Sequence, residues 1–171
     1  VMLKLFRLFL IFVVVSAQAQ TPEDLLLKDY RPRSIYKVPA SSIQKARYPA
    51  IDIHSHPYAR TDEDLAQWVR TMDAAGIEKT IIMTMATGKR FDSLYAKYAT
   101  YGNRFEVWCG FDYTGYEESG WSEKAVRELE RCFKVGARGV GELGDKGLGE
   151  LFSRPTRAYG MHVDDPRMQP L

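Results

Sequence analysis

The chain has 171 residues, of which 24 are Lys or Arg, 22 are Asp or Glu and 45% are hydrophobic. Its net charge of +2 lacks the basic excess of a nucleic-acid-binding surface, so we expect no nucleic-acid partner. The two cysteines, Cys109 and Cys132, fall on apolar patterns, which predicts buried thiols rather than a disulfide bond.

Residues 1–19 have the pattern of a secretory signal peptide. Two basic residues precede an apolar run from Leu8 to Val15, which is too short to span a bilayer. Ala17-Gln18-Ala19 fits the small-x-small rule for cleavage. We therefore expect an exported protein, periplasmic or extracellular, that starts at Gln20 and has no stable membrane association. An uncleaved membrane anchor is the alternative interpretation.

Residues 20–49 are rich in proline, which predicts an irregular lead-in to a domain over residues 50–171. Strands and helices then alternate along the chain. The predicted strands are 51–56, 79–86, 105–112 and 137–143, and the helices between them begin near Thr61, Phe91 and Ser122. This βαβ alternation predicts a parallel sheet with right-handed crossovers.

The first and third helices show the most specific signals. Thr61 precedes several acidic residues, which predicts an N-cap, and Gly76 predicts a left-handed C-cap. Ser122 is the predicted N-cap of the third helix. The predicted apolar stripe of the first helix is Leu65, Trp68, Val69 and Met72, and that of the third is Val126, Leu129 and Phe133.

A TIM barrel fits this pattern better than an open nucleotide-binding sheet, which usually has a Gly-rich turn where this chain has His54-Ser55-His56-Pro57. We predict a partial (β/α)8 barrel: strands 1–4 with three crossover helices, an irregular stretch over 144–162, and an end at the start of a fourth helix near Asp165-Pro166. Inward-facing residues such as Val107 and Cys109 would then be exposed, and this half alone would be inactive. A complete small domain that dimerises is the alternative.

The end of the first strand carries the clearest chemical signal. Asp52, His54 and His56 alternate onto one face, and two imidazoles at i and i+2 can hold a divalent cation. Asp52, one step deeper, would either orient a ligand ring through a hydrogen bond or be a plain buried carboxylate. The alternative for the whole motif is a half-buried strand with two incidental histidines.

Glu142 lies among glycines at the predicted end of the fourth strand, where it would either bind the metal or pair with Arg138 or Lys146. Asp112 and Asp145 are further strand-end carboxylates, but their spacing assigns neither of them a role as general base. His162 lies in the irregular stretch that follows. We interpret it as a mouth-lining or structural residue, with a substrate-binding role as the alternative.

The segment Ile51-Asp52-Ile53-His54-Ser55-His56 resembles the first strand of the amidohydrolase superfamily, metal-dependent hydrolases of TIM-barrel fold. Residues 141–147, Gly-Glu-Leu-Gly-Asp-Lys-Gly, are most similar to its amidohydrolase family 2 branch. The resemblance implies that His54, His56 and Glu142 bind a catalytic divalent ion, usually zinc. It also implies that the remaining ligands and the general base belong to a C-terminal half beyond residue 171.

The resemblance implies hydrolysis of a C–O or C–N bond in a small-molecule lactone, ester or amide through a metal-activated water. Three alternatives remain open: a nonoxidative decarboxylase of the same branch, a TatD-like phosphodiesterase and a non-catalytic binding barrel. The absence of a basic excess disfavours the phosphodiesterase.

Overall fold

The computed structural model describes residues 22–39 and 41–171 and divides into two units, 1–41 and 42–171. The predicted signal peptide, residues 1–19, lies outside the described residues. In the first unit, the described residues form two short 3-10 helices, η1 (Pro22–Asp24) and η2 (Leu27–Asp29). The site and the core described below belong to the second unit.

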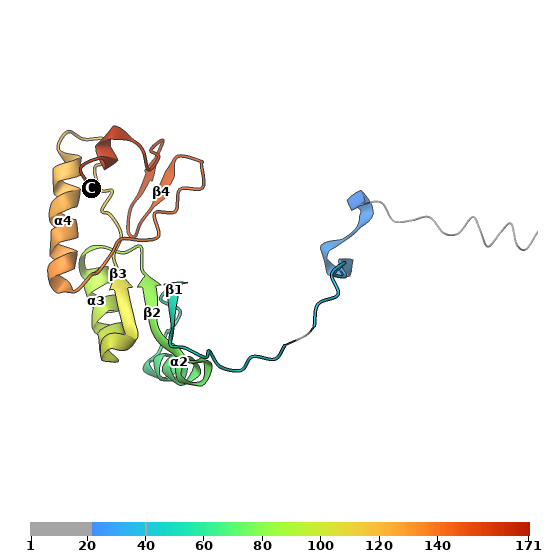
Figure 1. The fold of residues 1–171 in the computed structure, drawn as a ribbon. Coiled ribbons are helices and arrows are strands. Elements are labelled where there is room, and N and C mark those ends of the chain that lie inside the picture. Colours follow the sequence, from blue (N-terminus) through green and yellow to red (C-terminus); the bar gives the residue numbers. More distant parts are fainter. Residues whose placement is uncertain (1–21, 40) are drawn as a thin grey trace, which may run out of the picture. The chain divides into compact units, whose positions relative to one another are not determined.

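The second unit begins with a parallel sheet that has helices between its strands (Figure 1). The strand order is β1-β2-β3, and both neighbouring pairs are parallel. The strands are β1 (Ala50–Ser55), β2 (Ile77–Met83) and β3 (Phe105–Trp108); the helices are α2 (Asp62–Ala75), α3 (Gly88–Ala99) and α4 (Trp121–Val135), with a 3-10 turn η3 (Gly102–Arg104) before β3. The strand–helix alternation is therefore as predicted as far as α4.

Helix α2 has the boundaries that its sequence predicts. The Thr61 hydroxyl accepts a hydrogen bond from the Asp64 N–H at 3.1 Å, and the Asp64 carboxylate accepts the Thr61 N–H at 2.8 Å. This reciprocal capping box satisfies N–H groups that a helix start leaves without partners. Gly76 ends the helix with φ 78°, and Leu65 and Met72 of the predicted stripe are buried.

Helix α4 differs from the prediction in its cap and in its buried face. Gly120, not Ser122, is the N-cap residue, and the Ser122 hydroxyl donates to the Arg167 carbonyl at 2.8 Å. Phe133 of the predicted stripe is 62% exposed. The buried residues are Trp121, Ala125 and Cys132. Cys132 is buried in the same hydrophobic cluster as Phe91 and Tyr98 of α3, so this side of α4 packs against α3, and the neighbouring Arg131 pairs with Asp92 of α3 at 2.7 Å.

The predicted fourth strand does not form. Residues 137–143 make a single parallel bridge, between Val140 and Cys109, rather than a strand. A Cβ at Gly139 would lie 2.5 Å from the Trp108 indole ring, so the backbone passes this ring only because Gly139 has no side chain. The segment then turns toward the end of β2, where the Met85 N–H donates to the Gly141 carbonyl at 3.2 Å.

The chain that follows forms a hairpin where we predicted an irregular stretch. Strands β4 (Glu150–Phe152) and β5 (Arg157–Tyr159) pair antiparallel, and a short 3-10 helix η4 (Pro166–Met168) follows. Asp165 caps η4 by accepting the Arg167 N–H. The barrel prediction is therefore wrong: a three-stranded parallel sheet, a two-stranded antiparallel sheet and three α-helices form a small mixed α/β domain. A TIM barrel is parallel throughout.

Two hydrophobic clusters stabilise this domain. The first lies between the parallel sheet and its helices and includes Phe91, Tyr98 and Val107. The second lies between the hairpin, the start of α4 and the C-terminal residues, and includes Trp121, Leu151 and Met161. The expectation that Val107 and Cys109 are exposed is wrong, because their exposed fractions are 2% and 0%. Cys109 and Cys132 are free and buried, as predicted.

Candidate metal centre

The two strand-one histidines stand at the C-terminal end of an edge strand. β1 ends at Ser55, which is buried, and His56 follows it directly. The alternation of the strand directs Ile51 and Ile53 to the other face, where they are 55% and 68% exposed. The two imidazole rings lie edge to face with centroids 5.3 Å apart. They therefore present their nitrogens to the same space.

Glu142 completes the cluster from a distant part of the sequence. Its Oε2 lies 3.5 Å from Nε2 of His54 and 3.6 Å from Nε2 of His56. One ligand atom from each of the three residues lies within 4.8 Å of the others. The structure thus brings together the three residues that the sequence analysis proposed as ligands, and this group can hold a metal ion.

The spacing of these atoms fits a small divalent cation. Zinc binds nitrogen and oxygen at 2.0–2.2 Å in a tetrahedron, which places neighbouring ligand atoms ~3.4 Å apart. The two His–Glu separations of 3.5 and 3.6 Å are close to that value. Two imidazoles and one carboxylate are also a donor set that zinc accepts, and three protein ligands leave a fourth position open.

The protonation of His56 is set by its neighbour on β2. Its Nδ1 lies 3.0 Å from the Met83 carbonyl oxygen. Because a carbonyl can only accept, Nδ1 carries the hydrogen, and Nε2 of the neutral ring has the free lone pair. This lone pair faces Glu142. Metal-binding histidines are oriented in the same way by their second nitrogen.

Lys146 forms an ion pair with the other oxygen of Glu142. The hydrogen bond from Lys146, opposed by desolvation and assisted by the charge of the lysine, holds the pKa of the Glu142 carboxyl below its usual value. Glu142 is therefore ionised at neutral pH, as a ligand must be. Of the two pairing partners considered from the sequence, Lys146 forms the ion pair with Glu142, while Arg138 donates to the Ala137 carbonyl instead.

The other residues predicted for the site lie in different surroundings. The Asp52 carboxylate accepts the backbone N–H of His54 at 3.2 Å rather than an imidazole hydrogen. His162 hydrogen-bonds through Nδ1 to Asp145 at 2.8 Å. Asp112 accepts the backbone N–H of Thr114 at 3.0 Å. Neither His162 nor Asp112 belongs to the group of possible metal ligands in the described residues.

A cavity of about 360 Å³ opens beside the cluster, and His56 and Glu142 form part of its wall. Tyr58 lines it as well, and its ring packs edge to face on His56. The wall also includes Arg90 and Arg154, which the sequence analysis did not single out. No spacing pattern marks them, because they come from α3 and from the loop after β4 and meet only through the fold.

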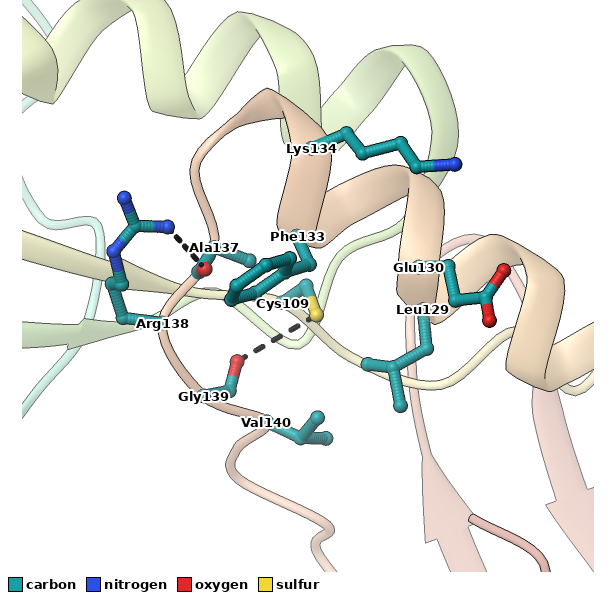
Figure 2. A pocket seen from close by; sticks show the side chains of 9 residues that line it. All are labelled: Cys109, Leu129, Glu130, Phe133, Lys134, Ala137, Arg138, Gly139 and Val140. Carbon is teal, nitrogen blue, oxygen red and sulfur yellow. Dashed lines mark hydrogen bonds between the residues drawn. The ribbon is translucent and has the colours of Figure 1, made fainter.

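A second cavity, of about 550 Å³, lies between α4 and residues 137–140 (Figure 2). Leu129, Phe133 and Val140 give it a largely apolar wall, and the Cys109 thiol donates to the Gly139 carbonyl at 3.6 Å. None of the grouped ligand residues lines it. The candidate chemistry therefore belongs to the smaller cavity.

Comparisons of the chain with protein-family models, with curated proteins and with solved structures found no match. Within the residues that the structure describes, no helix has both the length and the apolar character needed to cross a membrane.

Proposed function

We propose that the protein is a metal-dependent hydrolase that cleaves a C–O or C–N bond of a small molecule. The observation that carries this proposal is the convergence of His54, His56 and Glu142, with His–Glu separations of 3.5 and 3.6 Å, beside a cavity of about 360 Å³ whose wall includes His56 and Glu142. The donor set and the adjoining space for a small molecule together suit catalysis better than a purely structural metal site, which is closed.

Each residue of the cluster would have a separate role in binding the metal ion. In such a site, His54 and His56 would bind the ion through nitrogens of their neutral imidazole rings. The Met83 carbonyl holds His56 in the tautomer that this requires. Glu142 would bind the ion through one carboxylate oxygen. Lys146 binds the other oxygen and thereby orients the carboxylate. A divalent ion, most often zinc with such ligands, would lower the pKa of a bound water and polarise a carbonyl group.

Solvent reaches the cluster directly. The side chain of His54 is 55% exposed, and that of His56 is 23% exposed. Water is therefore available as the second substrate without any rearrangement of the chain. Tyr58 and Met85 offer apolar surface in the adjoining cavity for the carbon skeleton of a small molecule.

The test begins with metal rather than with turnover. The chain is stripped with a chelator, loaded with zinc, dialysed, and its metal content is measured by mass spectrometry. We expect about one bound ion per chain, and a loss of that ion in the His54→Ala, His56→Ala double variant. His162→Ala is the matched control, because it removes the third histidine and leaves the cluster intact.

The loaded chain is then assayed on chromogenic esters, lactones and anilides, with release of carbon dioxide measured in parallel. Metal-dependent hydrolysis that is absent from the double variant supports the proposal. Carbon dioxide release without hydrolysis assigns the decarboxylase alternative. Stoichiometric metal with neither reaction across the panel contradicts hydrolysis of these bonds by residues 1–171 and favours the non-catalytic binding alternative.

A further inference from the structure

The cavity beside the candidate metal centre is lined by two arginines, Arg90 and Arg154. Arg90 lies in the first turn of α3, and Arg154 lies just after β4. Both side chains are exposed. Neither guanidinium forms an ion pair with a carboxylate of the described residues, and the Arg154 guanidinium lies 5.7 Å from the centroid of the Phe152 ring.

Two carboxylates near the start of α3 already have partners. Asp92 binds Arg131 at 2.7 Å, and Glu128 binds both Arg131 and the backbone N–H of Gly88. Glu142 is the one carboxylate on the cavity wall, and Lys146 pairs with it. The cavity therefore has an excess of positive charge before any cation binds to the histidines.

The backbone fixes the two arginines relative to each other. The Arg154 N–H donates to the Met85 carbonyl at 2.8 Å, and its own carbonyl accepts the Thr87 N–H at 3.3 Å. Thr87 is the N-cap residue of α3, so the loop that carries Arg154 is hydrogen-bonded to the start of the helix that carries Arg90. The two side chains thus reach the same cavity from segments that are held together.

We infer that Arg90 and Arg154 bind an oxyanion of the substrate, a carboxylate or a phosphate. The inference rests on the proposed function and narrows its substrate class to small anionic molecules. A guanidinium matches the planar, two-oxygen edge of a carboxylate or phosphate, and charge-assisted hydrogen bonds of this kind are stronger than neutral ones. Tyr58 and Met85 then contact the remaining carbon skeleton.

Binding of simple probes tests this inference without any turnover. Benzoate and phenyl phosphate are titrated calorimetrically into the full chain, both after chelation and after zinc loading, and benzamide serves as the neutral probe. We expect one or both anions to bind in both states and benzamide to bind at least about tenfold more weakly. The anion that binds more tightly identifies the oxyanion.

Variants separate the two arginines from general surface charge. Arg90→Gln and Arg154→Gln should each weaken anion binding by about tenfold or more, with unchanged zinc content and unchanged circular dichroism. Arg127→Gln is the matched control, because Arg127 is an exposed arginine of α4 outside the cavity. Anion binding that is unchanged in both cavity variants overturns the inference.

The experiment also separates this inference from the proposed function. A chain that binds anions through Arg90 and Arg154 but takes up no zinc supports the anion site and contradicts the hydrolase. A chain that binds zinc but neither anion contradicts the anion site alone. Equal binding of benzamide and benzoate also overturns the inference, because it shows that the charge contributes nothing.

Discussion

The chain has two histidine–carboxylate clusters, one at Asp145 and one at Glu142, and their carboxylates are hydrogen-bonded in different ways. Asp145 accepts the backbone N–H groups of Gly147, Leu148 and Gly149 on Oδ1 at 2.9–3.1 Å, and it binds His162 through Oδ2 at 2.8 Å. Its side chain is 7% exposed. Both oxygens of the Asp145 carboxylate therefore bind groups of the protein itself.

The cluster at Glu142 is different. Its Oε2 lies 3.5 and 3.6 Å from the two imidazole nitrogens, distances longer than an ordinary hydrogen bond. Because Nδ1 of His56 holds the ring hydrogen, its Nε2 has no hydrogen to place between the ring and Glu142. The comparison shows that proximity of a histidine to a carboxylate does not define a site. The Asp145 cluster stabilises a loop, whereas the Glu142 cluster could hold a cation.

The largest expected effect comes from removing both strand-one imidazoles. His54→Ala with His56→Ala leaves one carboxylate that is already paired with Lys146, so zinc affinity should fall by more than about a hundredfold. A competition titration against a chromophoric chelator measures the dissociation constant. Zinc affinity in the double variant equal to that of His162→Ala would show that the two clusters do not differ as we argue.

Replacing Glu142 and Asp145 by the matching amides tests which of the two clusters binds zinc. Glu142→Gln keeps the shape but removes the charged ligand, and should weaken zinc binding by about 10- to 100-fold. Asp145→Asn should leave zinc affinity unchanged, because Asp145 binds His162 and backbone N–H groups instead. An equal loss in both variants would mean that the loop carrying both residues, not Glu142 itself, determines the affinity.

The Asp145 cluster should affect the stability of the fold rather than zinc binding. The His162 hydrogen bond, followed by backbone N–H groups, lowers the pKa of the Asp145 carboxyl below its ordinary 3.8. A lowered folded-state pKa stabilises the fold above the ordinary value, and this stabilisation is lost as the pH falls through the folded value. Asp145→Ala should therefore lower the unfolding midpoint at pH 6.

The same two proteins are then compared at pH 3, where wild-type Asp145 is closer to its protonated state. The difference in thermal midpoint, followed by circular dichroism, should shrink between pH 6 and pH 3. The control is Glu130→Ala, which removes an exposed carboxylate of α4. A difference that stays constant with pH would show that the ionisation of Asp145 does not contribute to stability.

Local patterns predicted the parts of the molecule that local chemistry determines. The capping box of Thr61 and the alternation that places His54 and His56 on one face depend on residues a few positions apart. Glu142 was also a predicted ligand, although the strand expected to carry it is absent. A single bridge from Val140 to Cys109 and one hydrogen bond from Met85 to Gly141 position it instead.

The rest of the fold depends on contacts that no short pattern encodes. Strands β4 and β5 have three residues each, which is too short for an alternation to be recognised. The buried face of α4 is set by packing against α3: Cys132 lies in the hydrophobic cluster of Phe91 and Tyr98, whereas Phe133 is exposed. The glycines at 139 and 141 allow the backbone to pass close beside the Trp108 ring, although no strand forms there.

The smallest expected effect concerns Lys146, which distinguishes the two clusters because, among the described residues, no lysine or arginine pairs with Asp145. Its ammonium group competes with a cation for the charge of Glu142, but its side chain is 71% exposed and solvent screens the pair. Lys146→Met should therefore raise zinc affinity by only about two- to fivefold, and added salt should reduce the difference. The chelator competition assay at low and high ionic strength measures both effects. Weaker zinc binding in Lys146→Met would assign the lysine the opposite role: it would then hold the carboxylate in position, and the orientation of Glu142 would matter more to the cluster than its free charge.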